Sequence, residues 1–224
     1  LTQEEIKKWQ IDDKYLVPVL SRANYATPPV FTMKDFAKLV QEGKKAYLLN
    51  ITELEPQGTI QNYLRYGKSN KVDQRYLTRH RTRWFFVEKR TPAPLLCKVF
   101  SRGVVQFILN ETDCLYLTSF HGIYPHHTDS RILKGLVLFL NSKMGNEMVK
   151  SHLRIYGGRL KKMEPRDVES ILVPNFSLCA NEELNRLEAL FENWRQTENK
   201  LSQADQQIEE YLSQIIEQIA RNKT

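Results

Sequence analysis

Apolar residues in the first third of the chain recur with the spacings of short helices and strands. The chain opens with a short polar helix that leads into an extended, proline-containing run at residues 15–20. Residues 33–42 have helical spacing and stop at Gly43, and residues 59–67 predict another helix with its apolar side chains inward. A strand is predicted between these helices at residues 46–51.

The middle of the chain is predicted to be mostly strand, and the part after it mostly helix. The strand-like segments are separated by Pro, Gly, Asn and Asp, and lie at residues 84–87, 95–100, 105–109 and 115–117. From Ser130 the period changes, and helices are predicted at residues 130–142, 147–153 and 164–170, before a strand-like run at 171–174. Strands followed by helices indicate an α+β fold, with a central antiparallel or mixed sheet and flanking helices.

A heptad pattern of apolar residues ends the chain. Asn181 is predicted to cap its first turn, and the apolar positions are Leu184, Leu187, Phe191, Trp194, Leu201, Ile208, Leu212, Ile215 and Ile219. Residues 181–221 contain neither Gly nor Pro, so we expect one amphipathic helix about 60 Å long. Glu198 and Asp205 interrupt the seam, and two alternatives stay open: a helix on its own domain, or a coiled coil that allows self-association through residues 181–221. We therefore divide the chain into a domain at 1–180 and this helix at 181–224.

Composition is that of an ordinary folded domain. Of the 224 residues, 41% are hydrophobic and 26% are charged. Cys97, Cys114 and Cys179 are odd in number, far apart and without CxxC spacing, which predicts neither disulfides nor zinc and favours a reducing cytoplasm. The apolar run at residues 132–140 is too short to span a membrane. The first ten residues do not resemble a secretory signal, and the absence of an initiating Met suggests a piece of a longer polypeptide.

Positive charge is concentrated at residues 65–102. This stretch holds 11 Lys and Arg residues against Asp73 and Glu88, and the whole chain carries a net charge of +7. Aromatic and apolar residues run through the same stretch, so we expect the cations to be mounted on folded structure. The pattern favours binding to a polyanion such as double-stranded DNA, because Lys and Arg that neutralise its phosphates release counterions. The alternative is a basic surface that only keeps the protein soluble.

Arginines crowd immediately before Trp84. If this segment is extended, Arg79, Arg81 and Arg83 share one face, with His80 among them, and could lie along a groove of DNA. The alternative is a salt-bridged surface strand. Trp84 itself is predicted to lie in the core, on the same side as Phe86.

Two further groups of residues could contact DNA. The first combines two glycines that permit close approach with cations for phosphate oxygens, and comprises Tyr156, Gly157, Gly158, Arg159, Lys161 and Lys162. A plain helix-terminating turn is the alternative. The second group has donors and acceptors for base edges at predicted strand ends, although each could equally cap a turn, and comprises Arg102, Asn110, Thr118 and Ser119.

Catalytic motifs are missing. The chain contains no phosphate-binding glycine loop, no HExxH and no GxSxG. His126, His127 and Asp129 adjoin, but neighbours on an extended chain point to opposite sides, so no metal site is expected. We therefore expect neither catalytic residues nor a cofactor in this chain.

Ten segments together resemble a known family. They lie at residues 16–20, 60–67, 81–85, 90–94, 100–102, 107–110, 120–125, 139–142, 156–162 and 173–174. Taken in this order, residues 15–176 resemble the C-terminal target-recognition domain of N6-adenine DNA methyltransferases and fused restriction–methylation enzymes, the TaqI-like group. The terminal helix is similar to the spacer helices of type I specificity subunits. His80 and Phe85 depart from the family's usual pattern, which leaves the target sequence open.

The resemblance implies a division of labour within a restriction–modification enzyme. An upstream methyltransferase domain would bind S-adenosylmethionine and flip the adenine, while this domain clamps double-stranded DNA and chooses the site. Two other functions stay open: a protein-interaction module that assembles a restriction complex through the terminal heptads, and an RNA-binding or nuclease accessory domain. A deletion from Gln196 onward should separate the first of these from DNA recognition.

Overall fold

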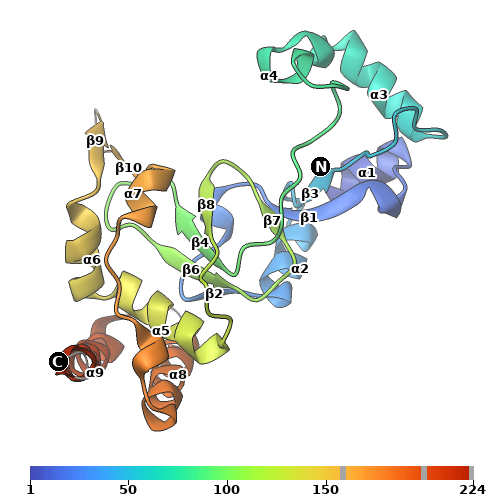
Figure 1. The fold of residues 1–224 in the computed structure, drawn as a ribbon. Coiled ribbons are helices and arrows are strands. Elements are labelled where there is room, and N and C mark those ends of the chain that lie inside the picture. Colours follow the sequence, from blue (N-terminus) through green and yellow to red (C-terminus); the bar gives the residue numbers. More distant parts are fainter. Residues whose placement is uncertain (157–159, 198–200, 222–224) are drawn as a thin grey trace.

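A four-stranded sheet lies at the centre of the computed structural model, which describes residues 1–156, 160–197 and 201–221 (Figure 1). In spatial order its strands are β2 (Val30–Phe31), β6 (Phe107–Asn110), β4 (Leu95–Lys98) and β8 (Phe120–Ile123). β4 pairs antiparallel with β6 and β8, whereas β2 and β6 are parallel. The predicted α+β fold with a mixed sheet is confirmed.

Both faces of this sheet are buried. Successive side chains of a strand point to opposite faces, so Leu95 and Cys97 enter one hydrophobic cluster while Leu96 enters another. Phe107 and Ile108 of β6 divide in the same way, and all five are at most 1% exposed. The continuous apolar run of β4 is the pattern of a strand covered on both sides.

Helices cover one face of the sheet. They are α5 (Ser130–Asn141), α6 (Lys143–Lys150), α8 (Asn181–Gln196) and α9 (Leu201–Arg221). Gly135 of α5 allows close approach, because a Cβ there would lie 3.0 Å from Leu187 of α8. The Asn141 side chain holds the end of α5 to β6, since its Oδ1 accepts from the Phe107 N–H at 3.1 Å and its Nδ2 donates to the Phe107 carbonyl at 2.9 Å.

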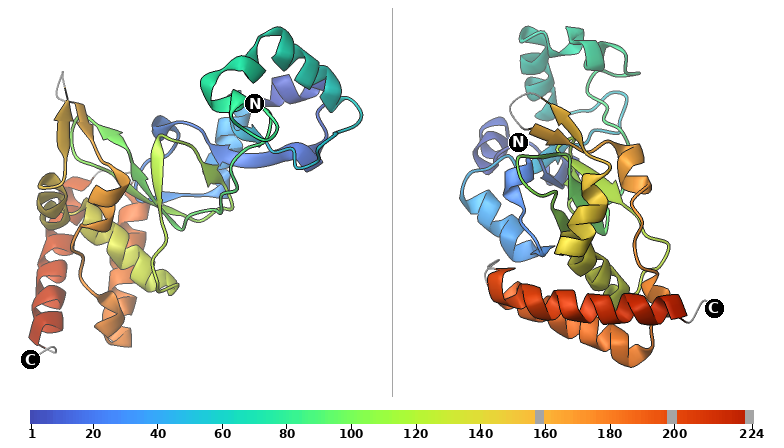
Figure 2. Two further views of the ribbon diagram at one scale, coloured as in Figure 1. Left: turned by 45° about the horizontal axis from the view of Figure 1, so that its top comes forward. Right: turned by 90° about the vertical axis from the view of Figure 1, so that its left-hand side faces the viewer.

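The prediction of one long terminal helix is wrong. α8 ends at Gln196, and α9 folds back along it, so that the Tyr211 hydroxyl donates to the Glu183 carbonyl at 3.2 Å (Figure 2). Residues 195–200 offer no apolar side chain to continue the seam, whereas folding back buries the apolar faces of both helices in the cluster that also includes α5. The buried heptad positions are Leu184, Leu187, Phe191, Trp194, Ile208, Leu212, Ile215 and Ile219. Glu198 and the side chains of Leu201 and Asp205 lie outside the described residues.

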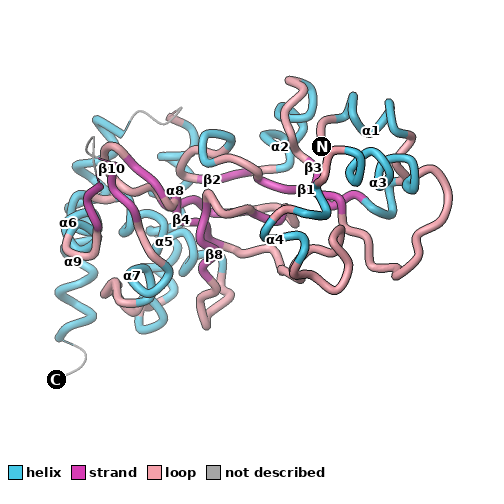
Figure 3. The backbone as a smooth tube through the Cα atoms, turned by 90° about the horizontal axis from the view of Figure 1, so that it is seen from above, coloured by secondary structure: helices cyan, strands magenta, loops and turns pink. Residues whose placement is uncertain are grey.

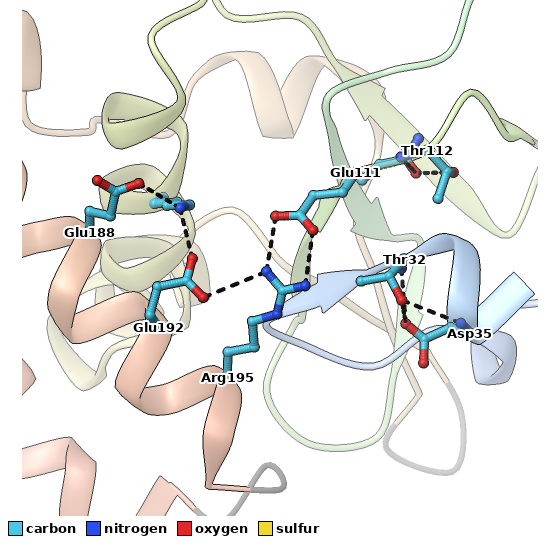
Figure 4. A network of polar contacts seen from close by, with 9 residues as sticks. Thr32, Asp35, Glu111, Thr112, Glu188, Glu192 and Arg195 are labelled. Carbon is cyan, nitrogen blue, oxygen red and sulfur yellow. Dashed lines mark hydrogen bonds and ion pairs between the residues drawn. The ribbon is translucent and has the colours of Figure 1, made fainter.

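A polar network ties α5 and α8 to the sheet (Figure 4). Lys134 of α5 lies 2.7 Å from both Glu188 and Glu192 of α8, and its side chain is 12% exposed. Burial alone would lower the pKa of the Lys134 ammonium, but the two carboxylates outweigh burial and raise that pKa. Arg195 then joins Glu192 to Glu111, which follows β6. Asn181 does not cap α8: Ala180 occupies that position.

The second face of the sheet is covered by the N-terminal part of the chain. Helix α2 (Met33–Gln41) forms where predicted, and its Thr32 cap exchanges hydrogen bonds with Asp35. Beside it, β1 (Leu16–Leu20) pairs antiparallel with β3 (Tyr47–Leu49) and parallel with β7 (Leu115–Tyr116). The cluster under α2 includes Phe31 and Phe36.

A third cluster supports an extension that we call the basic arm, residues 60–86. It contains α3 (Ile60–Ser69) and α4 (Tyr76–Arg79) and packs on α1 (Gln3–Trp9), with the Trp9 ring 4.8 Å from that of Tyr66. The predicted strand at residues 84–87 is wrong, because this segment turns, with the Phe86 N–H bonded to the Arg83 carbonyl. Trp84 is only half-buried and lies over Gly67, where a Cβ would be 2.5 Å from its ring.

A small sheet completes the fold. β10 (Leu160–Lys162) pairs with β9 (Arg154–Tyr156) and with β5 (Phe100–Ser101), and α7 (Pro165–Glu169) follows it. The run at 171–174, predicted to be strand-like, has no regular structure. None of the helices in the described ranges combines the length and the apolar composition that a membrane span requires.

Leu212→Ala should lower the free energy of unfolding by about 2–5 kcal/mol, because Leu212 is fully buried between α9 and the rest of the domain. Chemical denaturation would measure this loss, with exposed Gln214→Ala as a control that changes stability by less than about 0.5 kcal/mol. A midpoint that falls on dilution of the wild type would contradict packing within one chain. Deletion from Gln196 would remove the same buried side chains and is therefore no clean test of assembly.

Candidate nucleic-acid interface

In the described part of the chain the arginines of the basic arm have no carboxylate partners, and all of them except the half-buried Arg81 are exposed. Arg79 ends α4, while Arg81 and Arg83 lie in the turns that follow. In the part of the chain that the structure describes, none of the arm's cations forms an ion pair with an acid; they are Arg65, Lys68, Lys71, Arg75, Arg79, Arg81 and Arg83. A salt-bridged surface strand is therefore not what these residues form.

The predicted extended row of three arginines is wrong. Thr78 forms hydrogen bonds that hold the segment in consecutive turns. Its hydroxyl donates to the Arg75 carbonyl at 3.1 Å, and its carbonyl accepts from the Arg81 N–H at 3.2 Å. His80 is likewise held, with its Nδ1 2.5 Å from the Tyr76 carbonyl. Because the segment is not extended, the alternation of side chains along a strand does not determine which way these residues face. The arm offers clustered charge on a folded turn.

A hollow of about 450 Å³ opens on the arm. Its lining combines Arg65, Lys68 and Arg83 with the rings of Trp84 and Phe85. Cations beside flat aromatic faces suit phosphates and bases. The concentration of Lys and Arg at residues 65–102 predicted the cations of this hollow. It did not predict that α3 would lie against Trp84.

The small sheet carries the second predicted group. Lys161 is half-buried and donates to the Gly103 carbonyl at 3.0 Å, and Lys162 pairs with Glu164 at 2.6 Å. Arg102 is exposed in the turn after β5. Gly157, Gly158, Arg159 and the side chain of Tyr156 lie outside the described residues, so the diglycine clamp stays a prediction.

Strand β8 lies between these two groups. Seen from above, it runs between the β9–β10 pair and α4 (Figure 3), and in Figure 1 the β9–β10 pair and α4 both stand on the side of the molecule opposite α8 and α9. A hollow of about 610 Å³ follows β8, lined among others by Arg90, Thr118, Gly122 and Tyr124. His121 Nε2 lies 2.8 Å from the Met163 carbonyl and links β8 to the end of the small sheet.

Two tyrosines shape this β8 hollow. The phenol oxygens of Tyr116 and Tyr124 are 3.3 Å apart, and Tyr124 donates to the Thr91 carbonyl at 2.8 Å. Burial and the hydrogen bond with Tyr124 raise the pKa of Tyr116 to about 12, so this phenol stays neutral. A Cβ at Gly122 would lie 2.3 Å from the Tyr116 phenol oxygen, so only glycine fits at position 122 without a shift of the tyrosine. Neither tyrosine was among the contact residues predicted from the sequence.

The remaining residues predicted to contact base edges differ in whether they reach the surface. Thr118 is exposed and lines the β8 hollow, whereas the buried Ser119 Oγ has no hydrogen-bond partner among the described residues. Asn110 cannot read a base: it is 8% exposed, and its amide donates to the Ala93 carbonyl at 3.0 Å while its oxygen accepts from the Thr112 hydroxyl at 2.6 Å. The prediction for Asn110 is wrong because its position at a strand end serves the turns around it.

Charge is segregated between two sides of the fold. Helices α8 and α9 together carry eight acids against three basic residues, and they lie on the side opposite the basic arm (Figure 1). This distribution of charge favours the approach of a polyanion from the side that carries the basic arm.

Residues 1–209 match the family model of the C-terminal domain of the type II methyltransferase M.Eco57I. The chain is 30% identical over 191 residues to the type II methyltransferase M.AccI of Acinetobacter calcoaceticus, covering 84% of this chain and 35% of that protein. It is 33% identical over 122 residues to M.XamI of Xanthomonas campestris pv. amaranthicola, covering 54% and 22%. The chain thus spans about a third or less of these relatives.

A crystal structure of the type IIG restriction endonuclease BpuSI has a similar fold. The TM-score is 0.52 at 12% identity, over 86% of this chain and 22% of that one.

Asn110→Ala should lower the free energy of unfolding by about 1–3 kcal/mol, since it leaves buried backbone groups without partners. Calorimetry would measure the loss, and the exposed Thr118→Ala is the control. A fully stable Asn110→Ala variant with altered sequence preference would show that Asn110 contacts bases after all.

Proposed function

The chain belongs to the family of type II methyltransferase C-terminal domains represented by M.Eco57I, and we propose that it is the sequence-specific DNA-recognition domain of a restriction–modification enzyme. The observation that carries this proposal is the set of arm cations without carboxylate partners in the described part of the chain, on an arm that stands on the same side of the fold as the small sheet. Such cations gain free energy by displacing counterions from phosphates.

Base recognition is the task of the β8 hollow in this proposal. Thr118, Tyr124 and Arg90 line it and present hydroxyl and guanidinium groups that can bond to base edges. The arm and the small sheet would hold the backbone on either side. A protein that binds DNA by charge alone would need no such hollow with hydroxyl and guanidinium groups between its two basic groups.

The chemical step belongs to the rest of the parent protein. We propose that this is an adenine-N6 methyltransferase whose other domain binds S-adenosylmethionine and takes the flipped adenine, while this domain holds the flanking duplex. M.AccI and M.XamI, which this chain matches over about a third or less of their lengths, support an additional methyltransferase region.

An assembly role through the terminal heptads is less well supported. Such a role needs apolar positions free for a partner, but the heptad positions of α8 and α9 whose side chains the structure describes are buried in the domain's own hydrophobic cluster. An RNA partner would share the phosphate contacts, and competition of duplex RNA against duplex DNA for the full-length protein distinguishes the two.

Arg81→Ala and Lys161→Ala should each weaken binding to duplex DNA by about 1–3 kcal/mol and reduce the salt slope by about 1. The two residues lie on separate structural units, so their effects should add. Fluorescence anisotropy at several salt concentrations would measure both quantities for the full-length protein.

The matched control for this pair is Arg186→Ala, which removes an exposed arginine from the acidic helical side. It should leave affinity and salt slope unchanged. Equal losses for Arg186→Ala and Arg81→Ala would mean that charge acts without regard to position, and an unchanged slope for both Arg81→Ala and Lys161→Ala would remove the assignment.

A further inference from the structure

Two large apolar side chains stand exposed at the tip of the basic arm. Tyr76 is 71% exposed and Leu77 is 72% exposed, and they are neighbours on α4. Figure 1 shows α4 on the side of the arm that faces the β9–β10 pair. The helix that carries Leu77 is therefore the part of the arm nearest to the proposed path of the duplex.

The helix that carries Leu77 is held in place by its own polar contacts. The Thr78 hydroxyl donates to the carbonyls of Val72 and Arg75, and the Arg79 N–H donates to the Arg75 carbonyl at 2.9 Å. These bonds join the preceding turn to α4. An apolar side chain on a fixed support can enter a partner with little loss of backbone freedom.

The neighbours of Tyr76 distinguish it from Leu77. The Tyr76 ring lies 4.9 Å from the His80 ring and 5.3 Å from the Arg79 guanidinium, so it already has ring and cation partners. No ring contact or hydrophobic cluster among the described residues includes Leu77. Of the two, Leu77 is the side chain whose apolar surface gains most from a partner.

Charge decides which partner fits. Lys71, Arg75, Arg79 and Arg81 surround α4 in sequence, and none is paired with an acid in the described part of the chain. A purely apolar protein groove would leave these cations unpartnered. A DNA duplex offers phosphates for the cations and stacked bases for the apolar tip, and proteins are known to insert such side chains between base steps.

We propose that Leu77 is a wedge that enters a groove of the bound duplex and partly unstacks one base step. The inference rests on the proposed function of the chain as a DNA-recognition domain. The unstacked step bends easily, and a bend there lets one duplex contact both the basic arm and the small sheet across β8. Leu77 thus adds a readout of DNA deformability to the direct contacts in the β8 hollow.

Permanganate reactivity of thymines tests the wedge, because an unstacked thymine reacts faster than a stacked one. The probe is a set of duplexes selected from a random-sequence library for binding to the full-length wild-type protein. In its complexes, thymines at one step should become hyperreactive. Leu77→Ala keeps a good helix former at this position and should return their reactivity to that of free duplex, while Leu77→Met should retain it.

The matched control is Leu172→Ala, which truncates a leucine that is 77% exposed in the segment after α7. It should leave the thymine reactivity unchanged. The salt slope of binding should also stay the same in Leu77→Ala, since no cation is removed.

Two results would overturn the wedge, and they differ in what they say of the proposed function. Wild-type protein that binds duplexes with a steep salt slope but produces no hyperreactive thymine would remove the wedge and leave DNA recognition in place. Wild-type protein that selects no duplex at all would remove both. Hyperreactivity that persists in Leu77→Ala would assign the distortion to other residues and contradict the inference.

Discussion

Burial of the four-stranded sheet on both faces is the constraint on which the rest of this structure depends. Leu95 and Leu96 are adjacent in β4 yet contribute to two different hydrophobic clusters, and each is at most 1% exposed. A side chain of this size contributes about 1.5–3 kcal/mol when fully buried. The helical layer and the N-terminal layer are therefore fixed against the same strands, and the edge strand β8 runs beside the β8 hollow.

Function follows from what this arrangement leaves uncovered. The acids of α8 and α9 lie on the layer behind the sheet, while the basic arm and the small sheet stand on the other side with β8 between them. A hollow beside an edge strand can hold polar side chains such as Thr118 and Arg90 without disturbing either core. The layered core thus serves as a rigid base for groups that meet a large anionic partner.

Local patterns in the sequence predicted the elements whose causes are local. The helix at residues 33–42 and that at residues 130–142 have a clear apolar period, and caps at Thr32 and Asp129 fix where they begin. Elements governed by distant contacts were misread. Residues 84–87 look like a strand, but Trp84 turns to lie over Gly67 of α3. The heptads after Asn181, interrupted only at Glu198 and Asp205, did not show that α9 would fold back into the cluster that contains α5.

The candidate site shows the same division. The cluster of cations at residues 65–102 was readable, because charge density needs no knowledge of the fold. The sequence did not show which polar groups face outward. Asn110 makes hydrogen bonds within internal turns, while Tyr116 and Tyr124 line the β8 hollow. Those assignments depend on packing between segments that are distant in sequence.

The central claim is that the basic arm and the small sheet hold one duplex across β8, and tethered cleavage tests it most directly. Cysteines replacing the exposed Thr82 and Gly103, each alone and in a Cys179→Ser background, would carry an iron chelate that cuts nearby DNA; Cys97 and Cys114 are buried. The account predicts cuts from both positions on opposite flanks of one bound site, and none from a cysteine at Gln218 of α9. Cutting from Gln218, or from only one of the two positions, would contradict it.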